Sequence, residues 1–176
     1  QAGIQKKEKN KNELLIKINL FQGILKHDHM ELVFEKCTEL GVAGFTPFIS
    51  SRVVKTGLNY ERGRRIIKEA AEQSGRGKLP LLNEIIDFAR AVKEVKKGDL
   101  NIIFYEKAKE GLGALKTKKR PDGVNIFIGP EGGFSEEEIK LAEKNKFHVL
   151  SLGKTKLRGE TAAIVATALV REFAKK

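Results

Sequence analysis

Short apolar runs alternate with segments of helical periodicity along the chain. The runs carry the β-branched and aromatic residues that buried strands favour, and they lie at 14–20, 45–49, 79–82, 101–105, 124–128 and 148–152. The helical segments lie at 28–40, 59–74, 85–95, from 135 onward and at 160–175. Strands that alternate with helices at short intervals predict an α/β fold, with a mostly parallel sheet and helices on both faces.

A glycine-rich turn separates the fifth apolar run from the helical segment after it. The turn reads Gly-Pro-Glu-Gly-Gly-Phe over 129–134, and Ser135 with Glu138 has the spacing of a capping box. Three glycines leave little side-chain bulk, so a ligand can approach the backbone closely. Glu131 and the glutamates at 136–138 would repel an anion. The turn therefore suits a neutral or positively charged ligand better than a phosphate.

A second turn, at 153–159, lies between the last apolar run and the last helical segment. It contains Gly153-Lys154-Thr155, which resembles the end of a phosphate-binding P-loop, but His148 stands where that motif requires a glycine. No GxGxxG sequence follows the first predicted strand. Neither nucleotide-binding motif is therefore supported.

The composition is that of an ordinary globular protein, with 40% hydrophobic and 32% charged residues in a chain of 176. A chain of this length suits one domain. No apolar stretch approaches the roughly 20 residues that a membrane span needs, and no secretory signal is evident. The single cysteine, Cys37, lies beside apolar positions in a helical pattern, so we expect a packed thiol in a protein of the reducing cytoplasm.

The net charge of +11 bears on the choice of partner. A domain this basic attracts phosphate backbones. Binding to a membrane surface is the competing explanation, but no basic amphipathic helix with a strong aromatic face is evident. The chain has no tryptophan and two tyrosines, so we expect contacts with the backbone of a nucleic acid and little base stacking.

The tripeptide His27-Asp28-His29 has the residue types of a metal site. A ligand set needs convergent groups from elsewhere, and no second cluster accompanies this one, so we expect no metal. Asp28 is expected to cap the helix that runs to Leu40, and Gly41 is expected to end that helix.

The last helical segment, 160–175, is apolar around nearly its whole circumference. A helix that is apolar all round is expected to be buried all round. A terminal helix rarely achieves this within one small domain, so we expect a homodimer that forms through this segment.

Taken together, the two turns resemble the paired signature of the SPOUT-class methyltransferases and, within that class, the RsmE family. That family has a GPEGGF-type turn and an LGxxxLRxETA-type segment, which here lie at 129–134 and 152–163. The segments 35–42 and 69–76 also match the family. The resemblance extends from about residue 14 to the C-terminus.

The resemblance implies a SPOUT-type α/β fold with a C-terminal trefoil knot, a dimer, and S-adenosylmethionine as the cofactor. It implies an enzyme that methylates N3 of a specific uridine in 16S ribosomal RNA of the small subunit, the family's uracil-1498 site. The alternative is a non-catalytic RNA-binding ribosome assembly factor that keeps the fold. Residues 14–176 would form the methyltransferase domain. Residues 1–13 would be a linker or the remnant of the family's N-terminal PUA-like barrel, whose absence would weaken RNA binding.

The resemblance also assigns residues to the site. The cofactor would lie against the two turns and the end of one strand, at Tyr105, Glu106, Ile128, Gly129, Gly132, Gly133, Leu152, Gly153 and Leu157. RNA contacts are expected at Arg52, which follows a strand, and at Arg76 and Lys78, which the neighbouring glycines would expose.

The acceptor nitrogen of uracil carries a proton that must leave as the methyl group arrives. A base, or a cation that stabilises the uracil oxyanion, would therefore help. Arg158 is the leading candidate for the cation, because a guanidinium is always charged and offers several donors. The alternative is an ion pair of Arg158 with Glu160 or Glu131. These two glutamates could act as bases, although capping roles are equally consistent with their positions.

Overall fold

A computed structural model describes residues 10, 12–26, 28–53, 57–115 and 121–174. Of the expected linker or barrel remnant at 1–13, only residues 10, 12 and 13 lie in this set, and His27 and Lys175 lie outside it. None of the described helices is long and apolar enough to cross a membrane.

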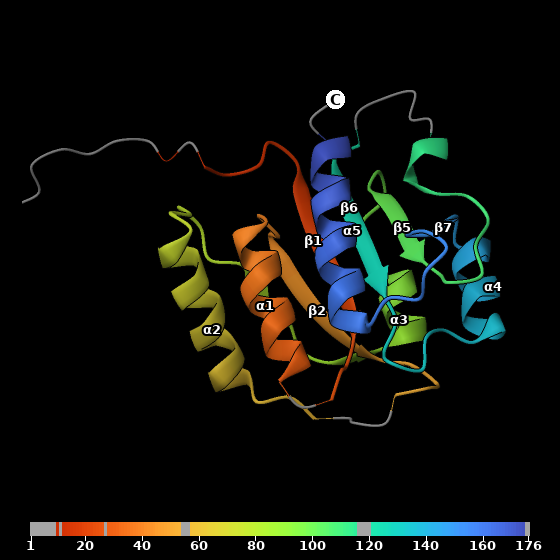
Figure 1. The fold of residues 1–176 in the computed structure, drawn as a ribbon, viewed down its shortest axis with the longest axis horizontal. Coiled ribbons are helices and arrows are strands. Elements are labelled where there is room, and N and C mark those ends of the chain that lie inside the picture. The colour runs from red at the N-terminus through yellow and green to blue at the C-terminus, as the bar shows by residue number, and fades with distance from the viewer. Residues whose placement is uncertain (1–9, 11, 27, 54–56, 116–120, 175–176) are drawn as a thin grey trace, which may run out of the picture.

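The described strands form one seven-stranded sheet in which every pairing is parallel, as the alternation of strands and helices predicts (Figure 1). The order across the sheet is β3-β2-β1-β6-β5-β7, and β4 also pairs with β2. The strands are β1 Lys17–Gly23, β2 Gly44–Ile49, β3 Leu81–Leu82, β4 Ile86–Asp87, β5 Leu100–Phe104, β6 Gly123–Ile128 and β7 His148–Leu150. The first strand begins three residues later than predicted.

Helices cover both faces of the sheet, and each face has its own cluster of buried side chains. The helices are α1 His29–Glu39, α2 Tyr60–Gln73, α3 Phe88–Lys93, α4 Glu136–Lys144 and α5 Gly159–Phe173, with a short 3-10 helix, η1, at Leu112–Ala114. On one face, α1 packs against both α2 and α5 over a mostly aliphatic core that also holds Phe34, Phe45 and Phe104. On the other face, α3 and α4 cover a cluster of phenylalanines in which Phe21 and Phe127 stack at 4.2 Å.

Two local predictions were wrong. The segment 85–95 was expected to be one helix, but Ile86 and Asp87 pair with β2, so the helix begins only at Phe88. The edge of β2 that faces away from β1 supplies these backbone partners, and the local sequence pattern does not reveal them. Asp28 does occupy the N-cap position of α1, but its backbone is helical and its side chain makes no capping hydrogen bond.

The thiol of Cys37 is packed, as predicted. Cys37 is fully buried, and this burial raises its pKa to about 12 although Thr167 forms a hydrogen bond with it. A thiol in this state is inert as a nucleophile at neutral pH.

Parallel pairing brings the carboxyl ends of β1, β6, β5 and β7 to one edge of the sheet. The segments that follow β6 and β7 contain the two turns singled out in the sequence. Crevices outside the carboxyl ends of parallel strands are where such folds bind ligands. The sheet therefore places both turns where a site is expected.

Candidate functional site

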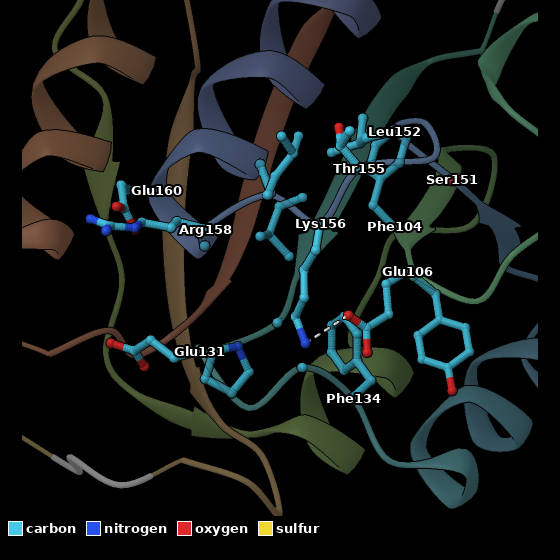
Figure 2. Close-up of a pocket in the computed structure, with 18 of the residues that line it drawn as sticks. Phe104, Glu106, Glu131, Phe134, Ser151, Leu152, Thr155, Lys156, Arg158 and Glu160 are labelled. Carbon is cyan, nitrogen blue, oxygen red and sulfur yellow. Dashed lines mark ion pairs between the residues drawn. The ribbon is translucent and has the colours of Figure 1, made fainter.

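A cavity of about 510 Å³ lies at this edge of the sheet (Figure 2). Residues of both turns line it, together with the end of β5 and the first turns of α1 and α5. Its volume falls within the range of roughly 300–1,000 Å³ that small-molecule sites have. The two turns therefore form one cavity, although about 20 residues separate them in the sequence.

The first turn is held at its C-terminal end by hydrogen bonds of Ser135 and Glu138. Ser135 Oγ accepts the backbone N–H of Glu138, and Glu138 Oε2 accepts that of Ser135 at 2.8 Å, so the predicted capping box is confirmed. The other oxygen of Glu138 accepts the backbone N–H of Ser51 after β2, at 2.9 Å. Gly133 has a φ of +67°, which glycine adopts without strain.

The second turn closes against the first. Gly153 has a φ of +130°, and the Ser151 hydroxyl bonds to the backbone of Gly153. At the end of the turn, a Cβ on Gly159 would lie 2.7 Å from Leu25 Cδ2 and 3.6 Å from the carbonyl oxygen of Gly129. Gly159 therefore lies within van der Waals reach of Gly129, and a larger residue at position 159 would clash with Leu25.

Most of the predicted cofactor residues line this cavity. They are Tyr105, Glu106, Ile128, Gly129, Gly133, Leu152, Gly153 and Leu157. Gly132 is not a lining residue. A Cβ there would lie 2.9 Å from Cβ of Arg52 and 3.1 Å from its carbonyl oxygen, so Gly132 allows the turn to pass close to Arg52.

The three predicted catalytic residues also line the cavity, in different environments. Arg158 is exposed at the N-cap of α5, and Figure 2 shows its side chain pointing away from Lys156 and Glu106. Glu131 is exposed, and its Oε1 accepts the backbone N–H of Lys26 at 2.7 Å.

Glu160 is the third of these residues and is buried in the first turn of α5. Its Oε2 lies 3.5 Å from Nδ1 of His29. The predicted alternative, an ion pair of Arg158 with Glu160 or Glu131, does not occur among the ion pairs of the described residues. Arg158 therefore has a charged group free for a ligand.

Sequence reasoning missed two side chains of the cavity, Lys156 and His29. Nζ of Lys156 lies 3.0 Å from Oε2 of Glu106, and this ion pair links the second turn to the end of β5 (Figure 2). His29 was considered only as a metal ligand, although it lines the cavity. No group of three or more His, Cys, Asp or Glu side chains within the described ranges could hold a metal.

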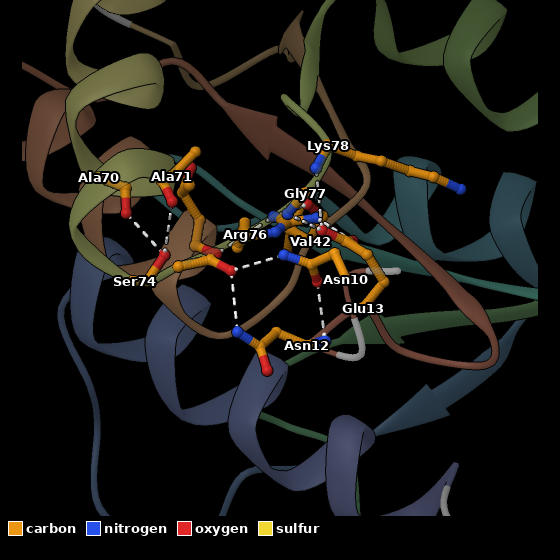
Figure 3. A network of polar contacts seen from close by, with 12 residues as sticks. Asn10, Asn12, Glu13, Val42, Ala70, Ala71, Ser74, Arg76, Gly77 and Lys78 are labelled. Atoms are coloured by element: carbon orange, nitrogen blue, oxygen red, sulfur yellow. Dashed lines mark hydrogen bonds and ion pairs between the residues drawn. The ribbon is translucent and has the colours of Figure 1, made fainter. Parts of the chain in front are cut away.

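Two of the three residues predicted to contact RNA are exposed, and the side chain of the third is buried. Arg52 and Lys78 are exposed, and Nη1 of Arg52 donates to the carbonyl oxygen of Gly132 at 3.1 Å. The expected exposure of Arg76 was wrong, because its side chain is only 5% exposed. It donates to the carbonyl oxygens of Thr38 and Val42 and pairs with Glu13 at 2.9 Å (Figure 3). Arg76 thus fastens the segment before β1 to the end of α2.

Substituting Arg76 should therefore reduce stability. Arg76→Ala is expected to destabilise the fold by about 2 kcal/mol, because it leaves buried carbonyls and the Glu13 carboxylate without their donor. Denaturant unfolding measures this, with the exposed Arg65→Ala as the matched control. An unchanged unfolding midpoint in Arg76→Ala would contradict the structural role.

The same contact gives this stability a pH dependence. Burial alone would raise the pKa of Glu13, but the hydrogen bond and charge of Arg76, with the backbone N–H groups of Lys78 and Gly77, hold that pKa below its usual value. A carboxyl group whose pKa is lowered on folding stabilises the fold at pH values above its pKa in the unfolded chain. This stabilisation is lost as the pH falls through the pKa of the folded state. The difference in the free energy of unfolding between wild type and Arg76→Ala should therefore become smaller below about pH 4.

Helix α5 is not buried all round within one chain. One face is buried, with Ala163, Ala166 and Val170 in the core against α1 and the sheet. On the other face, Leu169 is 44% exposed. The predicted dimer would have to cover this second face.

The chain matches the RNA methyltransferase domain family over residues 11–171. It is 35% identical to ribosomal RNA small subunit methyltransferase E of Mesomycoplasma hyopneumoniae, over 93% of this chain and 73% of that protein. The Bacillus subtilis protein of the same name is 33% identical over 90% of this chain. The chain spans 66% of that relative's length, less than two thirds.

The fold is shared with solved structures. The Neisseria gonorrhoeae ribosomal RNA small subunit methyltransferase E bound to S-adenosyl methionine superimposes with a TM-score of 0.87 at 32% identity. The match covers 94% of this chain and 70% of that one. The α/β fold predicted from the sequence is therefore that of known methyltransferases.

Proposed function

The chain belongs to the RNA methyltransferase family, and we propose that it is an S-adenosylmethionine-dependent enzyme that methylates N3 of a specific uridine in 16S ribosomal RNA of the small subunit. The observation that carries the proposal is the convergence of two glycine turns on one cavity of about 510 Å³. The similarity to ribosomal RNA small subunit methyltransferase E proteins supports the RNA as substrate.

The residues of the cavity fit S-adenosylmethionine. Ile128, Leu152 and Leu157 offer apolar surface for an adenine, and the glycines let its edge reach backbone N–H and C=O groups. Glu131 and Glu160 supply negative charge that favours a cationic sulfonium. When bound, S-adenosylmethionine supplies an electrophilic methyl group.

The protein's own contribution to the chemistry is to handle charge on the acceptor base. Removal of the N3 proton leaves negative charge on the uracil oxygens. Arg158 lines the cavity, its side chain has no intramolecular ion pair in the described part of the chain, and a guanidinium can donate two hydrogen bonds to such an oxyanion. We assign Arg158 this role and keep Glu131 and Glu160 as candidate proton acceptors.

The proposal also covers the RNA contacts, the oligomeric state, the path of the C-terminal segment and the cellular location. The RNA backbone would contact Arg52 and Lys78, which are exposed, and a partner subunit would cover the Leu169 face of α5 to form a homodimer. The C-terminal segment would be threaded as a trefoil knot. The enzyme would work in the cytoplasm, where ribosomal RNA is modified.

The substrate is tested by mass spectrometry of ribosomal RNA from cells that lack this protein. The 3-methyluridine of 16S ribosomal RNA should disappear and return when the wild-type protein is restored, but not when Arg158→Ala is supplied. An unchanged methyluridine content would overturn the assignment of 16S ribosomal RNA as the substrate. A protein that binds RNA without changing its methylation would instead be the non-catalytic assembly factor.

A further inference from the structure

The first turns of α1 and α5 meet at the wall of the cavity. His29 is the first residue of α1, and Glu160 is the second residue of α5. Both residues line the cavity, and Nδ1 of His29 lies 3.5 Å from Oε2 of Glu160. The two residues are separated by 131 positions in the sequence, so it is the packing of α1 against α5 that brings their side chains together.

Both facing atoms are buried, and neither makes a hydrogen bond with any residue that the structure describes. Glu160 as a whole is 7% exposed, whereas the side chain of His29 is 36% exposed. A buried carboxylate oxygen without a donor is costly, and the imidazole Nδ1 is the potential donor that faces it. A closure of a few tenths of an ångström would make a charge-assisted hydrogen bond.

The contact matters for the site because of what Glu160 adjoins. Arg158 precedes it by two residues and occupies the N-cap position of the same helix. Gly159, between them, fits closely against Leu25 and leaves the backbone little room to shift in that direction. The position of the Glu160 side chain therefore bears on the first turn of α5 and on the backbone from which Arg158 extends.

We propose that His29 is a positioning residue of the methyl-transfer site, which donates through Nδ1 to Glu160 and so fixes the first turn of α5 and Arg158 upon it. This inference rests on the proposed function. It assigns Glu160 a structural partner at the cavity wall, so that Glu160 is held in place and is not a freely rotating base.

Three substitutions at His29 separate the possible roles. Asn places an amide donor where Nδ1 lies, Gln places one near Nε2, and Leu removes both donors. We expect kcat to fall about tenfold in His29→Leu and in His29→Gln, and to recover to within about threefold of wild type in His29→Asn. The KM for S-adenosylmethionine should change less than about threefold throughout, because the cofactor contacts are retained.

Methyl transfer to 16S ribosomal RNA, measured with radiolabelled S-adenosylmethionine, gives these values. The matched control is His148→Asn on the exposed edge strand β7, which should behave as wild type. Loss in His29→Asn with recovery in His29→Gln would overturn the proposal and make Nε2 the working atom, and equal loss in both variants would also overturn it. Wild-type kcat in His29→Leu would also overturn it.

A double-mutant cycle with Glu160→Gln tests whether His29 acts through Glu160. In that background His29→Leu should cost less than about threefold, because the charged acceptor is already gone. A full tenfold loss there would show that the two residues act independently. The failures are distinguishable: a wild-type protein that neither binds S-adenosylmethionine nor transfers methyl groups overturns the proposed function, whereas an active enzyme indifferent to His29→Leu overturns only this inference.

Discussion

Arg158→Ala is expected to lower the rate of methyl transfer at least about 100-fold and to change the affinity for S-adenosylmethionine less than about threefold. The side chain is exposed at the cavity, and its charge is not neutralised by an ion pair in the described residues. Its charge is needed only where negative charge develops on the acceptor base, so the loss should appear in kcat.

The measurement combines single-turnover methyl transfer with calorimetric titration of the cofactor. Arg158→Lys should recover only part of the rate, because an ammonium lacks the planar pair of donors. Lys154→Ala is the matched control, since Lys154 is an exposed cation on the same turn that does not line the cavity. A parallel loss of cofactor affinity in Arg158→Ala would make this residue part of the binding site for the cofactor instead.

Gly23→Ala should have the second large effect, although residue 23 does not line the cavity. A Cβ there would lie 2.5 Å from the backbone nitrogen of Pro130 and 2.6 Å from its Cδ. Both belong to a rigid turn, so β1 and the turn must move apart. We expect at least a tenfold loss of affinity for S-adenosylmethionine and a destabilisation of about 2 kcal/mol.

Calorimetry and denaturant unfolding of the same preparations measure both effects. The matched control is Gly57→Ala, where an added Cβ has no neighbour within 4 Å among the described residues. Wild-type affinity in Gly23→Ala would show that the first turn does not need its close contact with β1.

The features that the sequence predicted well are local ones. The capping box at Ser135 is encoded within four residues, so its spacing alone could reveal it. Gly41, at φ +97°, ends α1 as expected. The two turns could also be identified, because their glycines follow predicted strands directly.

The features that were missed depend on partners far away in sequence. Arg76 was expected to be exposed because its neighbours are glycines, but its ion-pair partner is Glu13, which lies 63 residues earlier. Gly23 is constrained by Pro130, and Gly132 by Arg52. Nothing near these positions in the chain reveals such contacts, since the packing of the sheet and its turns creates them.

The candidate site shows the same division. The glycines and leucines of the cavity follow from the two motifs, whereas the ion pair of Lys156 with Glu106 and the contact of His29 with Glu160 do not. Each pair joins segments that approach only when β5, β7, α1 and α5 have taken their places. Polar side-chain pairs across the cavity are therefore the part of this site that required the structure.

The central claim is that the two glycine turns form one binding site for S-adenosylmethionine. An amide NMR titration with S-adenosylmethionine tests it most directly, because it reports both binding and position. Saturable shifts are predicted at Gly129, Gly133 and Gly153, with a micromolar dissociation constant. Shifts confined to α2, or none at saturating cofactor, would contradict the account.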